Sequence, residues 1–219
     1  MENISLIFFI SIIVPLCVAC LIFDKRTRTN IFFLMLGILT CFFCGEFDGF
    51  LFQFFDIPEK EFAINVTPIV EEIAKAYPLL IYAFVFSPGR QKLMESAVIV
   101  GVGFAIFENV YILSQNIRSV SVGLALIRGF GSGMMHGVST LAVGYGISFI
   151  VMRRKLFITG SLGMLCVAVA YHSIYNELVQ SPLRIVGFIL PILTFIPFCV
   201  FLKRKAKQNR LRSSEAKNQ

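Results

Sequence analysis

Long apolar stretches alternate with short polar or charged segments along almost the whole chain. Each stretch has about the 20 residues that an α-helix needs to cross the hydrocarbon core of a bilayer. The pattern predicts seven transmembrane helices, at about Ile4–Phe23, Asn30–Phe54, Val66–Phe86, Ser96–Ser114, Val122–Met152, Phe157–Val179 and Leu183–Leu202. The fifth is long enough to be tilted, or broken near its glycines. We therefore predict an all-α, polytopic helix bundle over residues 1–203, followed by a basic tail at 204–219.

The composition excludes an ordinary soluble domain. Apolar residues make up 57% of the 219 residues and charged residues 15%, and the mean hydropathy is +0.79. So few charges cannot supply the polar surface that a soluble domain of this length needs. Two pairs, Cys17/Cys20 and Cys41/Cys44, have the spacing of metal or redox sites. Both lie inside apolar stretches, so we interpret these cysteines as small apolar packing residues.

The distribution of basic residues predicts the orientation of the bundle. The net charge is +7, and fifteen of the 20 Lys and Arg fall in the segments at 25–28, 90–92, 153–155 and 203–217. Cytoplasmic loops of membrane proteins carry such an excess of Lys and Arg. Seven helices with the N-terminus outside and the C-terminus in the cytoplasm fit this alternation. A basic tail after a final helix favours a membrane surface over a nucleic acid as its partner.

Ionisable side chains inside the predicted helices are the main functional signal, because a charge within a bilayer is costly. They are Glu71, Glu72 and Lys75 in the third helix, Glu108 in the fourth, His136 in the fifth, and His172, with the polar Asn176, in the sixth. In the predicted orientation these residues lie toward the extracytoplasmic face of the membrane. We therefore predict a single site at that level. Glu46, Asp48 and Glu177 are marginal candidates near helix ends.

Helical spacing refines this set. Lys75 follows Glu71 by four residues and Glu72 by three, so its ammonium can pair with either carboxylate. The other carboxylate is then left to act as a base or a ligand. His172 and Asn176 are four residues apart and share one helix face. Two consecutive GxxxG steps over 129–137 predict close approach of a neighbouring helix beside His136, and Gly101 with Gly103 predicts the same before Glu108.

Carboxylates and imidazoles that converge in a water-accessible pocket permit three kinds of chemistry. A carboxylate can act as a general base on water, with His and Asn groups stabilising an oxyanion. The same side chains can hold a divalent metal such as zinc that activates water. The residues predicted to hold such a metal are Glu72, Glu108, His136 and His172. The cluster can instead relay protons or coordinate ions during transport.

Four short motifs occur in order along the chain. They are EExxK at 71–75, GFAxxEN at 103–109 followed by Tyr111, HxxxxxxxG at 136–144, and HxxYN at 172–176. Their order and spacing, together with the seven-helix layout, resemble the PrsW family of intramembrane proteases. The motifs cover about residues 66–180, and the length and topology extend the resemblance to the whole chain.

The resemblance implies a membrane endopeptidase in a bacterial plasma membrane. It implies that the substrate is a membrane-anchored protein of the anti-sigma-factor type, cut near the extracytoplasmic face in site-1 proteolysis that starts a stress response. The implied site residues are Glu71, Glu72, Lys75, Glu108, His136, His172 and Asn176. The mechanism is then dependent either on glutamate alone or on a metal.

The sequence departs from more distant relatives of that family. Type II CAAX prenyl endopeptidases and bacteriocin-processing membrane proteins carry EExxxR, FxxxH and HxxxN, whereas this chain reads FxxxE from Phe104 to Glu108. His136 is the candidate for the missing imidazole. An ion- or proton-coupled transporter and a non-catalytic membrane binding protein remain alternatives that use the same cluster. A prenyl-protein protease is a third, disfavoured because the predicted site faces away from the cytoplasm.

Overall fold

The structure is a computed structural model that describes residues 4–115, 118, 121–152, 154–197 and 200. All secondary structure in these residues is helical, as the hydropathy pattern predicts. The elements are α1 (Ile4–Ile22), α2 (Lys25–Phe52), α3 (Glu59–Asn65), α4 (Thr67–Phe86), α5 (Arg90–Gln115), α6 (Val122–Ile147), α7 (Phe149–Met152), the 3-10 turn η1 (Arg154–Leu156), α8 (Phe157–Val179) and a final helix at Arg184–Pro197. The predicted basic tail at 204–219 lies outside the described residues.

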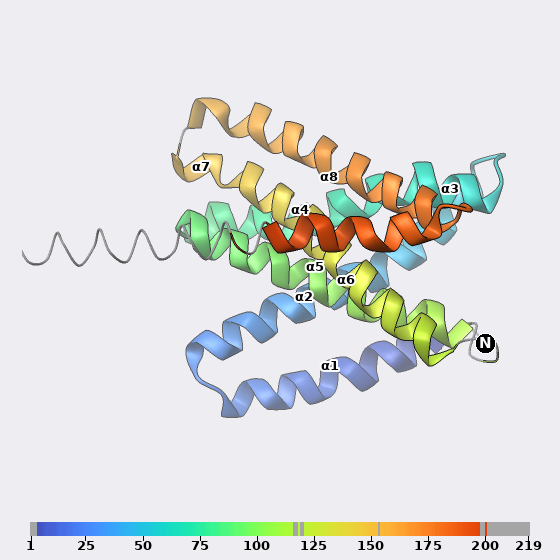
Figure 1. Cartoon of the computed structure of the whole chain (residues 1–219). Helices are drawn as coiled ribbons and strands as arrows, with labels where there is room; N and C mark the ends of the chain where they lie inside the picture. The colour runs from blue at the N-terminus through green and yellow to red at the C-terminus, as the bar shows by residue number, and fades with distance from the viewer. Residues whose placement is uncertain (1–3, 116–117, 119–120, 153, 198–199, 201–219) are drawn as a thin grey trace, which may run out of the picture.

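The long helices form one bundle with α5 at its centre (Figure 1). Helix α5 packs against both α2 and α6, and α6 packs in turn against α8. The α1–α2 connection and α7 lie at one end of the bundle, whereas α3 and the N-terminal end of the chain lie at the other (Figure 1). Successive long helices therefore run in alternating directions.

Four of the described helices are long and apolar enough to cross a membrane by length and composition. These are α1, α2, α5 and α8. Helix α4 has 20 residues but carries Glu71, Glu72 and Lys75, and α6 has 26 residues and contains Arg128 and His136. The count of seven spans and the orientation of the termini stay predictions.

Helix α2 begins five residues before its predicted start. Asp24 caps it: its carboxylate accepts hydrogen bonds from the Arg26 amide at 2.9 Å and the Thr27 hydroxyl at 2.5 Å. A capping carboxylate satisfies amides that the first turn leaves unpaired. These hydrogen bonds, that of Thr27 first, hold the pKa of Asp24 below its usual value. The basic residues at 25–28 are thus the first turn of a helix and not a loop.

Three other boundaries differ from the prediction. Helix α5 begins at Arg90, six residues before its predicted start at Ser96. The single helix expected over Val122–Met152 is broken, because α6 ends at Ile147 and Ser148 separates it from α7. This agrees with a break near the glycines, since Gly144 and Gly146 precede it. Helix α3 was not predicted, because its seven residues are too few for a span. Its Phe62 is buried against the rings of Phe52 and Phe55.

Close backbone contacts bring α5 against its neighbours. A Cβ atom on Gly103 would overlap the carbonyl oxygen of Leu34 in α2, and one on Gly101 would overlap the carbonyl oxygen of His136 in α6. The predicted approach at Gly101 and Gly103 is therefore found. The approach predicted for the GxxxG steps is wrong, because Gly129 and Gly133 have no neighbouring atoms at the Cβ position and Gly137 makes only ordinary contacts.

Candidate active site

Helix α4 brings three charged side chains into the protein interior. Glu71 is 7% exposed, and Glu72 and Lys75 are fully buried. They can share one helix because residues three and four apart lie on the same face. The Lys75 Nζ atom lies 2.6 Å from Glu72 Oε1 and 3.9 Å from Glu71 Oε2. The primary ion pair is therefore with Glu72, and Glu71 is the carboxylate left available.

Two neighbouring side chains determine which ring nitrogen of His136, on α6, carries the proton. Its Nδ1 atom lies 2.9 Å from Lys75 Nζ, and its Nε2 atom lies 2.9 Å from Glu108 Oε2. An ammonium group can only donate, so Nδ1 accepts from Lys75. The ring proton then sits on Nε2 and is donated to Glu108. The Phe104 ring lies beneath both groups, with its centroid 4.4 Å from Lys75 Nζ and 4.9 Å from the His136 ring centroid.

Glu108 of α5 is the most accessible carboxylate of the cluster. Its side chain is 22% exposed, against 9% for Glu71 and 0% for Glu72. Besides His136, its Oε2 atom accepts a hydrogen bond from the Ser132 hydroxyl at 3.0 Å. The Arg128 guanidinium lies 3.6 Å from Oε1. Glu108 is thus held by three donors from α6, while part of its side chain stays exposed.

His172 of α8 links the two carboxylates of α4. Its Nδ1 atom lies 2.9 Å from Glu72 Oε1, and its Nε2 atom lies 3.8 Å from Glu71 Oε2. The Glu72 oxygen also accepts hydrogen bonds from Lys75 and from the Ser139 hydroxyl at 3.1 Å. Since a carboxylate oxygen accepts, His172 donates from Nδ1, and its Nε2 carries a lone pair.

Two buried lone-pair groups therefore face each other across 3.8 Å, namely His172 Nε2 and Glu71 Oε2. The Glu71 oxygen is buried and has no hydrogen-bond partner among the described residues. Such a pair is unfavourable unless a proton or a cation lies between the two atoms.

The same two residues, with His136, form a group that fits a metal ion. One ligand atom each from Glu71, His136 and His172 lie within 4.8 Å of one another, and all three residues are buried. Nitrogen and carboxylate donors of this kind suit zinc and related divalent ions. Moreover, His172 donates its other ring N–H to Glu72, which is the usual arrangement behind a metal-binding histidine. The lone pair of His136 is on Nδ1, so His136 can join through Nδ1 when Lys75 no longer donates to that atom, while its Nε2 proton stays on the hydrogen bond to Glu108.

This group differs from the metal set predicted from sequence, which contained Glu72 and Glu108 in place of Glu71. In the structure Glu72 Oε1 is occupied by Lys75, Ser139 and His172 together. Glu72 Oε2 is buried without a hydrogen-bond partner among the described residues, as Glu71 Oε2 is, but Glu72 does not belong to the group whose ligand atoms lie close enough to share a metal. Glu108 is occupied by its own donors on α6. The spacing of α4 cannot distinguish Glu71 from Glu72, because either can pair with Lys75.

Asn176 hydrogen-bonds to α3 and not to the charged cluster. Its Nδ2 atom donates to the Ala63 carbonyl of α3 at 3.0 Å, so it joins the end of α8 to α3. Of the marginal candidates, Glu46 is exposed and accepts a weak hydrogen bond from Ser5, and Asp48 is half-buried on α2. Within the described part of the chain, Glu177 forms no hydrogen bond or ion pair with the cluster.

Sequence reasoning missed Arg128, Ser132 and Ser139. Arg128 was not among the predicted site residues, yet its Nε atom donates to Asn109 at 3.1 Å and its guanidinium approaches Glu108. The signal was present: Arg128, Ser132 and His136 follow one another at intervals of four residues, which places them on one face of α6.

Comparison with protein families gives one match, to a family described as PrsW family intramembrane metalloprotease, over residues 25–202. Comparisons with curated proteins and with solved structures gave no match.

Proposed function

Because the chain belongs to the PrsW family of intramembrane metalloproteases, and is therefore a membrane protease, we propose that it cuts a membrane-anchored regulatory protein near the extracytoplasmic face. The observation that carries this proposal is the buried Glu71–His172 pair, in which two lone-pair groups face each other beside His136. A metalloprotease site needs a group that binds a cation, and a carboxylate that exchanges protons with water can serve as its general base.

We assign the metal-binding role to Glu71, His136 and His172, and zinc is the ion that suits these donors best. When bound, a divalent ion polarises the scissile carbonyl and lowers the pKa of water. Glu72 contacts neither the metal nor the substrate in this assignment. It orients His172 through Nδ1, and Lys75 neutralises it, so both are positioning residues.

Glu108 is the proposed proton carrier. It has the most exposed carboxylate of the cluster, and it accepts the proton when a water oxygen bonds to the scissile carbonyl carbon. The C–N bond then breaks, and Glu108 returns the proton to the leaving nitrogen. Arg128 and Ser132 hold the carboxylate in place during both transfers. Asn176 acts at a distance, by joining α8, which carries His172, to α3.

The proposed substrate is a single-span protein of the anti-sigma-factor type, and the proposed location is the bacterial plasma membrane. Both follow the sequence resemblance and the predicted orientation. The family match favours this protease over the transporter and binding-protein alternatives, since its description names a proteolytic activity.

The test replaces the gene in its native host by variants Glu71→Gln, Glu108→Gln, His136→Ala and His172→Ala, each checked for membrane expression. New N-termini of membrane proteins are then identified by mass spectrometry. We expect at least one cut in a single-span protein that the wild type produces and every variant loses. Glu95→Gln, an exposed change on α5, is the matched control and should cut normally.

Equal cleavage by all four variants would overturn the assignment of the site. Cuts that depend on the site but fall only in proteins unrelated to transcriptional regulation would overturn the anti-sigma-factor substrate alone. Cuts on the cytoplasmic side of the substrate would overturn the proposed position of the site.

A further inference from the structure

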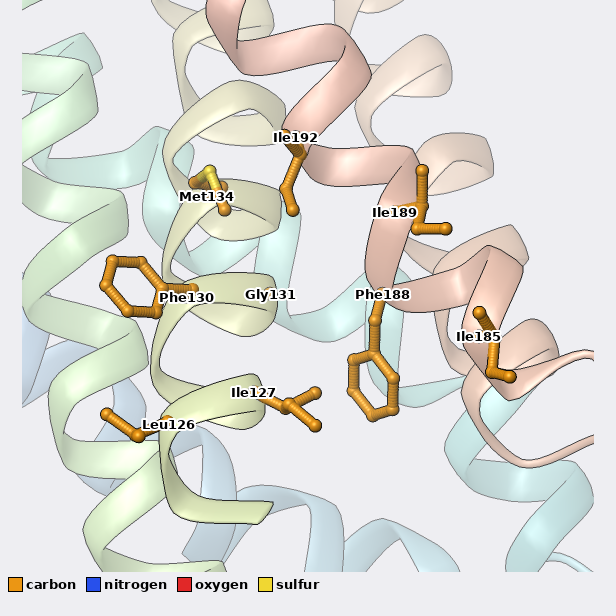
Figure 2. Close-up of a pocket in the computed structure, with 9 residues that line it drawn as sticks. All are labelled: Leu126, Ile127, Phe130, Gly131, Met134, Ile185, Phe188, Ile189 and Ile192. Carbon is orange, nitrogen blue, oxygen red and sulfur yellow. The ribbon is translucent and has the colours of Figure 1, made fainter. Parts of the chain in front are cut away.

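An apolar groove runs between α6 and the final helix, as Figure 2 shows. It has a volume of about 520 Å³, and all its lining residues are apolar side chains or glycine. On α6 it is lined by Phe130, Gly131 and Met134, among others, and on the final helix by Ile185, Phe188 and Ile189. Phe130 is 66% exposed and Ile189 is 45% exposed, so the groove opens outward on the side of the bundle.

The groove and the active site share α6. Gly131 forms part of its wall, and the next residue, Ser132, donates its hydroxyl to Glu108. A Cβ atom on Gly131 would come within 3.2 Å of both the Tyr175 hydroxyl and the Phe188 ring. Tyr175 is buried and lies three residues after His172 on α8. Thus two neighbouring residues of α6 connect the groove with the site: Gly131 lies against Tyr175, and Ser132 contacts Glu108.

The shape of the groove favours a helix as its occupant. The lining residues on each wall recur at intervals of three and four, as in a helix face that packs against another helix. The Cβ position of Gly131 is covered by Phe188 and Tyr175, so the open part of the groove is formed by the larger apolar side chains around it. The walls have no polar side chain that would hold water in place. Finally, the family acts within membranes, where its substrate's apolar segment can reach such a surface sideways.

We propose that this groove binds the transmembrane helix of the substrate and presents its end to the cluster of Glu108, His136 and His172. The proposal rests on the proposed function, because only a protease for membrane-anchored proteins needs such a surface next to its site. The Phe188 ring lies 3.2 Å from the Cβ position of Gly131, so the two walls of the groove approach each other there.

Photo-crosslinking tests this directly. A photoreactive amino acid replaces Phe130 or Ile189 in the full chain, in a Glu71→Gln background that prevents cleavage. The protein is reconstituted in phosphatidylcholine vesicles with a synthetic peptide that has one Leu/Ala-rich transmembrane segment. Matched controls carry the same amino acid at Leu124 on α6 and Leu193 on the final helix, which are exposed but do not line the groove.

We expect the peptide adduct to form several-fold more at Phe130 and Ile189 than at the two control positions. Filling the groove with Ile189→Trp should remove the adduct at Phe130, whereas Leu193→Trp should leave it unchanged. Adducts only with phospholipid or with a second copy of the chain would overturn the proposal. So would equal yields at all four positions. Each protein is first checked for unchanged elution on size-exclusion chromatography, so that a misfolded variant is not scored.

The result is separable from the test of cleavage. If the groove captures the peptide while the wild-type chain cuts nothing in its host, the groove stands and the proposed function fails. If the chain cuts its substrate through the assigned residues while no position in the groove crosslinks, the function stands and the groove proposal fails.

Discussion

Lys75 is the residue on which the charges of the site depend. It is fully buried, it pairs with Glu72 at 2.6 Å, and it fixes the proton of His136 by donating to Nδ1. Removing one partner of a buried ion pair leaves the other charge without compensation, whereas removing both is often tolerated. Lys75 therefore has both a structural and an electrostatic role.

We predict that Lys75→Met lowers the free energy of unfolding by about 3–5 kcal/mol. The physical reason is the uncompensated Glu72 carboxylate. The double variant Lys75→Met/Glu72→Gln should recover most of that stability without recovering activity. Unfolding of the purified protein in mixed detergent micelles measures both. A double variant as unstable as the single one would show that the pair is not the source of the effect.

The two adjacent glutamates should differ in metal binding. Glu71→Gln should abolish stoichiometric zinc binding, because it replaces a ligand. Glu72→Gln should weaken zinc affinity by about 10–100-fold, as expected when the group that orients a metal-binding histidine is changed. Metal content and a competition titration with a chelator measure the two effects in purified protein, with Glu95→Gln as control. Equal losses at both positions would contradict the division of roles.

The presence of ionisable residues in apolar stretches predicted more of the site than the spacing of residues along a helix did. A charged or imidazole side chain in an apolar stretch is visible in sequence because of its cost, and six of the residues found in this way do lie together: Glu71, Glu72, Lys75, Glu108, His136 and His172. Asn176 was predicted to join them from its four-residue separation from His172. Its amide instead binds Ala63, because the choice of partner depends on α3, which hydropathy does not reveal.

At the scale of elements, the contact between α5 and α6 sets the position of His136. Gly101 lies directly against the His136 carbonyl, so the backbones of the two helices touch at the level of the site. The sequence pattern of small residues predicted this contact but also predicted one at the GxxxG steps of α6. Glycine spacing identifies surfaces that permit close approach, and only the arrangement of neighbouring helices decides which of them is used.

Gly101→Ala should therefore destabilise the protein by about 1–3 kcal/mol, as expected for overpacking against backbone. It should also lower activity, since α6 must shift together with His136. Gly133→Ala on α6 is the matched control, because nothing lies near its Cβ position, and it should be neutral or slightly stabilising. Thermal unfolding in detergent and the cleavage assay are the measurements. Equal effects of the two changes would contradict the packing argument.

The helix boundaries were also predicted incompletely, because a local sequence pattern does not contain the contacts between helices. The apolar stretches predicted the six long helices α1, α2, α4, α5, α6 and α8, and misplaced the start of α2 because the cap at Asp24 gives charged residues a place in its first turn. The break at Ser148 and the short α3 depend on contacts with other helices, which a window of hydropathy does not contain.

The orientation of the whole molecule in the membrane can be tested by labelling single cysteines at its two ends. We expect Lys60→Cys in α3 to react with a membrane-impermeant maleimide in intact cells, and Lys92→Cys at the start of α5 to react only after the membrane is opened. The reason is the excess of Lys and Arg at the opposite end from α3. The unsubstituted chain reports the background of the native cysteines. The reverse pattern would invert the orientation and place the site toward the cytoplasm.

The distances along the chain between the partners of Glu72 have a consequence for biosynthesis. Ser139 lies 67 residues after Glu72, and His172 lies 100 residues after Glu72. Neither partner has been synthesised when α4 leaves the ribosome. Lys75 is on the same helix and can neutralise one carboxylate as soon as the helix forms. Until α6 and α8 are made, α4 carries two carboxylates and one ammonium, and therefore one negative charge in excess. Because each charge in a bilayer is costly, the lysine that organises the finished site also lowers the cost of placing α4 in the membrane before its partners are present.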